Sequence, residues 1–147
     1  MNDALHTLRD LIQPTGRFSD VRLDGAALRC RAKDAAAEAW YVVDREGDGW
    51  AVSLLTPDRW LSESIEGDML EGRDSAEELV DDELVEVGFP HRCQKVKHYR
   101  DDAKVYVFRT PVPLDGVADA AAGLKTYLLA FEAAFAQLGD MQGSDQG

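Results

Sequence analysis

The chain has 147 residues, which is the size of one domain, and 45% of them are hydrophobic, enough for a core without disulfides or metals. Its 28 acidic and 16 basic residues give a net charge of −12, which argues against nucleic acid and anionic membranes as partners. No apolar run has the length of a membrane span or a signal peptide. We therefore expect a cytoplasmic protein with a single domain over residues 1–139 and a flexible tail over 140–147.

The N-terminal half predicts one helix followed by a run of strands. Apolar residues at spacings of three and four predict a helix over 3–13. Apolar and polar residues then alternate, and turn sequences at 24–25 and 46–49 separate the alternating segments. The predicted strands are 18–23, 28–33, 38–45 and 50–55. Short neighbouring strands of this kind are typical of an antiparallel meander.

Two central helices are predicted next. Asp58 is the expected cap of a helix over 58–70. Ser75 and Glu78 form a capping box, in which each side chain accepts an amide that the helix start leaves unpaired. The residues expected on the buried face of the second helix are Val80, Leu84 and Val87.

The C-terminal part predicts a hairpin and a long helix. The hairpin strands are 94–99 and 103–109, and we expect Pro111 to end the pairing because proline donates no ladder hydrogen bond. A helix over 119–138 carries a continuous apolar stripe and is followed by Gly139, a favourable C-cap. The fold class is therefore α+β, an antiparallel sheet of about five strands flanked by N-terminal, central and long C-terminal helices.

This order of elements, and the stretch KVKHYRDDAKVYVFRTPVPLDGVADAAAGLKTYLLAFEAAF that begins at Lys95, resemble the YbjN family of bacterial proteins. The matching positions are Val105, Val107, Leu114, Gly116, Val117, Leu124, Leu128 and Phe131. The resemblance implies the fold of type III secretion chaperones, which are small, acidic, cytoplasmic homodimers that hold an unfolded stretch of a client protein. The segment between the two groups of strands is longer and more acidic here than that family's pattern.

The acidic residues concentrate between Glu63 and Glu86, where eleven acids and one base give a local charge of −10. One interpretation is a face that docks a basic partner, or that blocks a basic surface by mimicry. The other is a solvated helix face, whose acids near the N-terminus favour the helix. The candidate docking residues are Glu77, Glu78, Asp81 and Asp82.

Residue types that carry catalysis or bind metals form no recognisable motif. Cys30 alternates in register with Leu28, which predicts a buried thiol. His91, Cys93 and His98 lack the spacing of zinc ligands. Phosphate-binding loops and hydrolase or metalloprotease signatures are absent from the sequence. We therefore expect no catalytic residues, metal or cofactor.

Large aromatic side chains on the predicted strands are the candidate partner-binding residues: Trp40, Trp50, Tyr106 and Phe108. Either helices cover both faces of the sheet, or one face is an exposed binding patch or dimer seam. On the second interpretation the chain is a protein-binding, chaperone-like or regulatory module, working as a homodimer. It would capture an extended segment along a strand edge or over apolar pockets near these aromatics. The alternative is an uncharacterised enzyme or a small-ligand-binding domain.

Overall fold

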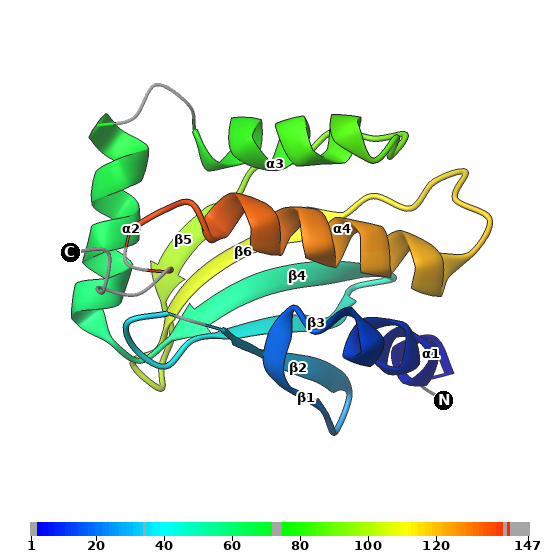
Figure 1. Cartoon of the computed structure of the whole chain (residues 1–147), viewed down its shortest axis with the longest axis horizontal. Helices are drawn as coiled ribbons and strands as arrows, with labels where there is room; N and C mark the ends of the chain where they lie inside the picture. Colours follow the sequence, from blue (N-terminus) through cyan, green and yellow to red (C-terminus); the bar gives the residue numbers. More distant parts are fainter. Residues whose placement is uncertain (1–2, 34, 72–74, 140, 142–147) are drawn as a thin grey trace.

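The computed structural model describes residues 3–33, 35–71, 75–139 and 141. All strands join one antiparallel sheet in the order β1-β2-β3-β4-β6-β5 (Figure 1). The strands are β1 (Phe18–Asp24), β2 (Ala27–Ala32), β3 (Trp40–Glu46), β4 (Gly49–Thr56), β5 (Lys97–Arg100) and β6 (Tyr106–Val112). The helices are α1 (Asp3–Ile12), the 3₁₀ turn η1 (Gln13–Thr15), α2 (Arg59–Glu71), α3 (Ala76–Glu86) and α4 (Ala120–Phe135). The predicted α+β class is confirmed, with six strands in the described part of the chain rather than about five.

The described helices leave one face of the sheet without a helix. In Figure 1, α1 and α4 lie over one face, α3 packs on the outer side of α4, and α2 stands beside the end of the sheet. The apolar stripe of α4 lies on the sheet: the Phe131 ring meets Tyr41 edge-on at 6.1 Å, and Phe135 lies 5.5 Å from Phe108. Leu61 and Ile65 of α2 join the same core cluster. None of the described helices is long and apolar enough to cross a membrane.

Several predicted signals act as the sequence indicated. The Asp58 carboxylate accepts the Leu61 amide at 2.9 Å, and the capping box of α3 forms with both of its hydrogen bonds. One prediction is wrong: β6 continues through Pro111 to Val112 instead of stopping. β5 is shorter than β6 and pairs only as far as Arg109, so the missing amide of Pro111 costs no ladder bond on that side.

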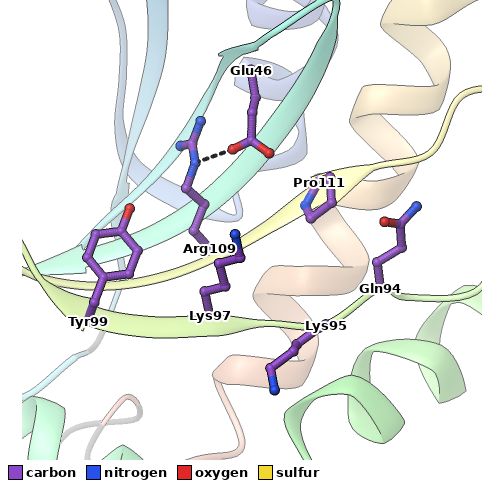
Figure 2. Close-up of a pocket in the computed structure, with 7 residues that line it drawn as sticks. All are labelled: Glu46, Gln94, Lys95, Lys97, Tyr99, Arg109 and Pro111. Atoms are coloured by element: carbon purple, nitrogen blue, oxygen red, sulfur yellow. Dashed lines mark hydrogen bonds and ion pairs between the residues drawn. The ribbon is translucent and has the colours of Figure 1, made fainter.

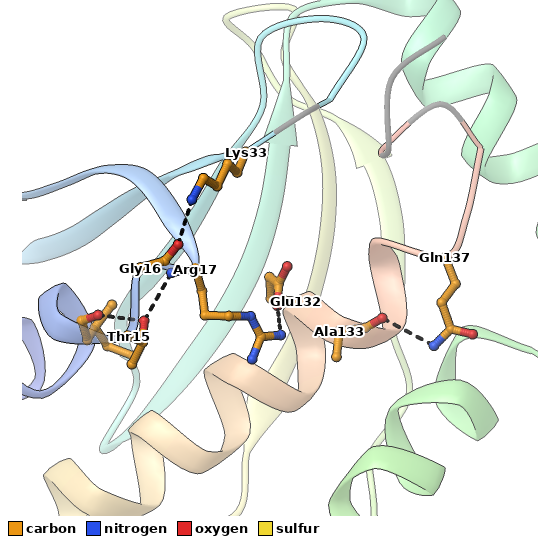
Figure 3. A network of polar contacts seen from close by, with 8 residues as sticks. Thr15, Gly16, Arg17, Lys33, Glu132, Ala133 and Gln137 are labelled. Atoms are coloured by element: carbon orange, nitrogen blue, oxygen red, sulfur yellow. Dashed lines mark hydrogen bonds and ion pairs between the residues drawn. The ribbon is translucent and has the colours of Figure 1, made fainter. Parts of the chain in front are cut away.

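Polar contacts fix the link between α1 and β1 to α4 (Figure 3). Arg17 forms an ion pair with Glu132 of α4, and the Lys33 ammonium donates to the Gly16 carbonyl at 2.9 Å. Burial raises the pKa of Glu132 above its usual value, and the guanidinium of Arg17 offsets part of that rise. These two contacts connect the β1–β2 hairpin to α4 and to the turn that follows α1.

The chain leaves α4 through Gly139, which crosses α2 at very short range. α4 ends at Phe135 with Ala136 as its C-cap, so the prediction that Gly139 caps the helix is wrong. Gly139 has a φ of +52°, and a Cβ at this position would lie 2.6 Å from the backbone nitrogen of Ile65. Its amide donates to the Asp68 carboxylate at 2.6 Å. The glycine is therefore required by the crossing of two segments.

The predicted flexible tail of 140–147 lies outside the described residues except for Met141, which is buried in the core cluster. The described part of the chain otherwise extends to Gly139, the last residue of the predicted domain.

Replacing Gly139 tests this crossing. We expect Gly139→Ala to lower the free energy of unfolding by about 2–4 kcal/mol, because it adds both backbone strain and a clash with α2. Gly116→Ala is the matched control, since Gly116 has a φ of +77° but nothing within 4 Å of a Cβ, and it should cost about 1 kcal/mol. Equal losses in urea unfolding would show that the close approach to α2 is unimportant.

Candidate binding surface

The strand register divides the sheet into two faces, because cross-strand partners point to the same side. Under the helices, one row of partners runs Cys30, Tyr41, Leu54, Phe108 and His98. On the opposite side, two rows run Arg22, Arg29, Val42, Ser53, Arg109, Lys97 and Arg31, Trp40, Leu55, Val107, Tyr99. We call these two rows the helix-free face. Its buried apolar residues, such as Trp40 and Val107, are not part of the main core cluster.

The four aromatics predicted to bind a partner do not form a common surface. Trp50 and Phe108 lie in the core under the helices, with 7% and 0% of their surface exposed. Trp40 points to the helix-free face, and Tyr106 is half-buried at the start of β6, where the Arg100 guanidinium lies 5.8 Å from its ring. Successive side chains of a strand point to opposite faces. The β3–β4 register pairs Trp50 with Arg45, whose side chain points to the face opposite that of Trp40.

Trp40 is covered by arginines instead of by a helix. The guanidinium carbons of Arg22, Arg29 and Arg31 lie 5.3, 5.1 and 5.9 Å from its ring, and only 8% of the residue is exposed. Its indole N–H donates to the Glu38 carboxylate at 2.8 Å. Cations over an indole face are attractive, and the aliphatic stems of arginine shield apolar surface. Described helices therefore cover one face of the sheet. On the other face, side chains of the sheet itself cover Trp40.

The helix-free face is hollowed at its β5–β6 side (Figure 2). This pocket has a volume of about 460 Å³. Its lining residues are Glu46, Gln94, Lys95, Lys97, Tyr99, Arg109 and Pro111. Figure 2 shows the side chains of Lys97 and Tyr99 rising from β5 on the side of Arg109, whereas Lys95 points away from it. The sequence did not predict this site, although Lys97 and Tyr99 recur with the strand period of two.

Arg109 is held rigidly in the wall of this pocket. Its Nε donates to Glu46 Oε1 at 2.8 Å, and its Nη1 lies 2.9 Å from both Asp44 Oδ1 and Ser53 Oγ. Burial lowers the pKa of Arg109, but Glu46 and Asp44 more than offset that effect and the pKa lies above its usual value. The guanidinium is therefore charged and fixed, and its Nη2 takes no part in these three contacts.

The acidic residues of α3 mainly serve the fold. Glu77 accepts the Val96 amide at 2.8 Å, Asp81 accepts the Cys93 amide, and Glu78 completes the capping box. These bonds attach the segment before β5 to α3. Asp82 is exposed and forms none of these bonds. Three of the four predicted docking residues therefore have partners within the chain, and the structure does not gather all four into a free acidic face.

Ser62, His98 and Glu66 form a second polar chain that the sequence analysis did not connect. His98 Nε2 lies 3.2 Å from Ser62 Oγ, and its Nδ1 lies 3.5 Å from Glu66 Oε2. The same imidazole stacks on Phe108 at 4.0 Å. A serine, a histidine and a carboxylate in this order can activate a nucleophile. Here only 2% of Ser62 is exposed, so a substrate has no access, and the contacts attach β5 to α2.

The two thiols are free and protonated at neutral pH. Burial raises the pKa of Cys30 to about 12 and that of Cys93 to about 11. The predicted burial of Cys30 is confirmed, at 0% exposure. Among the residues that the structure describes, no three histidine, cysteine or acidic side chains are placed to hold a metal ion.

An apolar groove runs between α3 and α4. Two adjoining hollows of about 420 and 270 Å³ share Val87, Ala122 and Thr126 as lining residues. Val87 is 60% exposed here, although the helix periodicity predicted that it would be buried. α3 ends at Glu86, so Val87 is the C-cap and has left the buried face of the helix. Glu83 of α3 and Lys125 of α4 both line the larger hollow.

Paired substitutions distinguish a structural acid from a free one. Asp81→Ala should lower the free energy of unfolding by about 1–3 kcal/mol, because it leaves the Cys93 amide without its acceptor. Asp82→Ala, at the exposed next residue of the same helix, should stay within about 0.5 kcal/mol of the wild type. Urea unfolding measures both, and a neutral result for Asp81→Ala would restore the acidic residues as a candidate docking face.

The residues of this chain are therefore the only basis for assigning a role to the helix-free face. Family models, curated proteins and solved structures were compared with the chain, and none of them matches it.

Proposed function

We propose that the chain is a protein-binding, chaperone-like or regulatory module that holds an extended client segment on the helix-free face. The observation that carries this proposal is that a six-stranded sheet receives helices on one face only among the described residues. The face ends at the edge strand β5, whose outer side pairs with no described strand. An unpaired edge presents backbone donors and acceptors to which a peptide can add as a further strand.

The apolar pockets considered near Trp50 and Phe108 are no longer part of the proposal, because the core fills them. Binding along a strand edge remains. The resemblance to the YbjN family supports the same function, since it implies the capture of a client segment. No catalytic step is proposed, because Ser62 is buried and both thiols have raised pKa values.

We further propose that the module is a homodimer and that a second copy occupies the groove between α3 and α4. The groove is mainly apolar and carries Glu83 on α3 and Lys125 on α4, besides Arg17, which is paired with Glu132. A two-fold axis places the same patch on both subunits, so Glu83 of each copy would face Lys125 of the other. Opposite charges on one patch make it complementary to itself.

A small-ligand-binding domain is the competing function, and the 460 Å³ pocket favours it because its volume suits a metabolite. A ligand that binds only the folded state raises the melting temperature. A clear rise with free dicarboxylates, together with no client bound to the helix-free face, would favour this alternative.

Site-specific photo-cross-linking in the source cell tests the client surface. A benzophenone amino acid at Tyr99, which is 43% exposed on the helix-free face, should give discrete adducts with another protein. The same group at Trp60, which is 74% exposed on α2, is the control and should give none. Adducts from Trp60 alone, or from neither position, would contradict the proposed surface.

Light scattering tests the homodimer. The wild-type chain should have twice the mass of one chain, and Val87→Asp should make it monomeric by burying a charge in an apolar interface. Trp60→Asp introduces the same charge at an exposed apolar residue outside the groove and should leave the dimer intact. Dissociation by Trp60→Asp but not by Val87→Asp would move the interface away from the groove.

A further inference from the structure

The residues that line the pocket of the helix-free face include more cations than carboxylates: Lys95, Lys97 and Arg109 against Glu46. Glu46 is its one carboxylate, and that group is already bound to Arg109 Nε. Lys95 and Lys97 form no ion pair with a described acid. The Nη2 of Arg109 takes no part in the contacts of that guanidinium with Asp44, Glu46 and Ser53. A cavity walled by free donors is complementary to an anion, and a guanidinium held by its other nitrogens is already oriented to bind one.

The strand register places two of these cations directly opposite each other. Lys97 of β5 is the cross-strand partner of Arg109 of β6, so both side chains rise from the same face. Like charges in such a pair repel, which lowers the stability of the free protein. The carboxylates of Asp44 and Glu46 form ion pairs with Arg109 and none with Lys97. A bound anion between the two cations would remove the repulsion.

A peptide that pairs with β5 would deliver side chains to this position. The peptide strand would lie about 4.8 Å from β5, and each of its residues would continue one row of cross-strand partners. One residue would lie opposite Lys97, and the residue two positions away would lie opposite Tyr99, whose hydroxyl is a further donor. β5 presents no acid on this face, so an added strand would meet only donors there.

We propose that the client segment is acidic, with carboxylates at alternate positions that enter the pocket beside Lys97 and Arg109. This inference rests on the proposed function of the helix-free face and adds the chemistry of the partner. A polyanionic nucleic acid is a poor candidate, because the net charge of −12 repels it while only a few cations gather here. A peptide contributes single carboxylates together with backbone hydrogen bonds to the strand edge.

Fluorescence anisotropy with synthetic peptides tests the proposal on the full chain. The probe is a fluorescein-labelled extended peptide with glutamate at alternate positions and threonine or valine between them. The comparison peptide carries glutamine in place of each glutamate. We expect the glutamate peptide to bind about tenfold more tightly, and added salt to reduce the difference. A third peptide, N-methylated along one edge, should lose binding because it cannot pair with β5.

Variants of the chain then locate the site. Lys97→Gln should weaken the glutamate peptide about tenfold and leave the glutamine peptide unchanged. Arg9→Gln removes the same charge from α1, at a position outside both the pocket and the groove between α3 and α4, and should change the affinity less than about twofold. Circular dichroism and the melting temperature confirm that both variants are folded, since Lys97 is exposed and its loss removes a repulsion.

The remaining outcomes are equally decisive. Equal affinity for the two peptides would overturn the acidic chemistry while leaving a peptide-binding face. Failure of every peptide to bind would overturn this inference, and the cross-linking at Tyr99 would then decide the proposed function by itself. Edge lysines can also act only to prevent edge-to-edge association. Self-association of Lys97→Gln without a change in peptide affinity would show that role instead and overturn the proposal.

Discussion

The fold depends on one constraint: a six-stranded sheet has two faces, and the described chain supplies a helix layer for one of them. Side chains alternate strictly along every strand, so apolar residues reach both sides. Under the helices they enter the common core. On the other side, Trp40 remains buried because the side chains of arginines lie across its ring. The helix-free face therefore collects arginine and lysine in a chain that is acidic as a whole.

Acidic residues of α3 position β5, although they do not belong to the helix-free face. Glu77 and Asp81 of α3 bind the amides of Val96 and Cys93, and these bonds fix the chain just before β5. His98 attaches β5 to α2 and stacks on Phe108. β5 is thus held beside β6 by contacts on the helix side, while its other side brings Lys97 next to Arg109. Glu77 and Asp81, which the sequence alone suggests as surface residues, act as hydrogen-bond acceptors within the chain.

We propose recognition rather than reaction from the chemistry of the described surface. Its thiols are protonated, and the serine of the one chain that resembles a nucleophile relay is enclosed. Arg109, in the pocket of the helix-free face, is fixed by neighbouring carboxylates. Groups of this kind select a partner by charge and geometry, and an edge strand adds affinity through the backbone. The apolar groove on the opposite side of the molecule leaves room for a second contact that does not compete with the first.

Local signals determined the elements, because capping, turn chemistry and helix periodicity involve residues at most four positions apart. Asp58, Ser75, the stripe of α4 and the buried Cys30 could all be predicted in this way, and so could the fold class. The binding surface could not. Alternation shows that a strand has two sides, but only the packing of the helices decides which side is covered, and a shift of one residue separates Trp40 from Trp50. Lys97 meets Arg109, and Glu77 meets Val96, through register and tertiary contacts that no short-range pattern encodes.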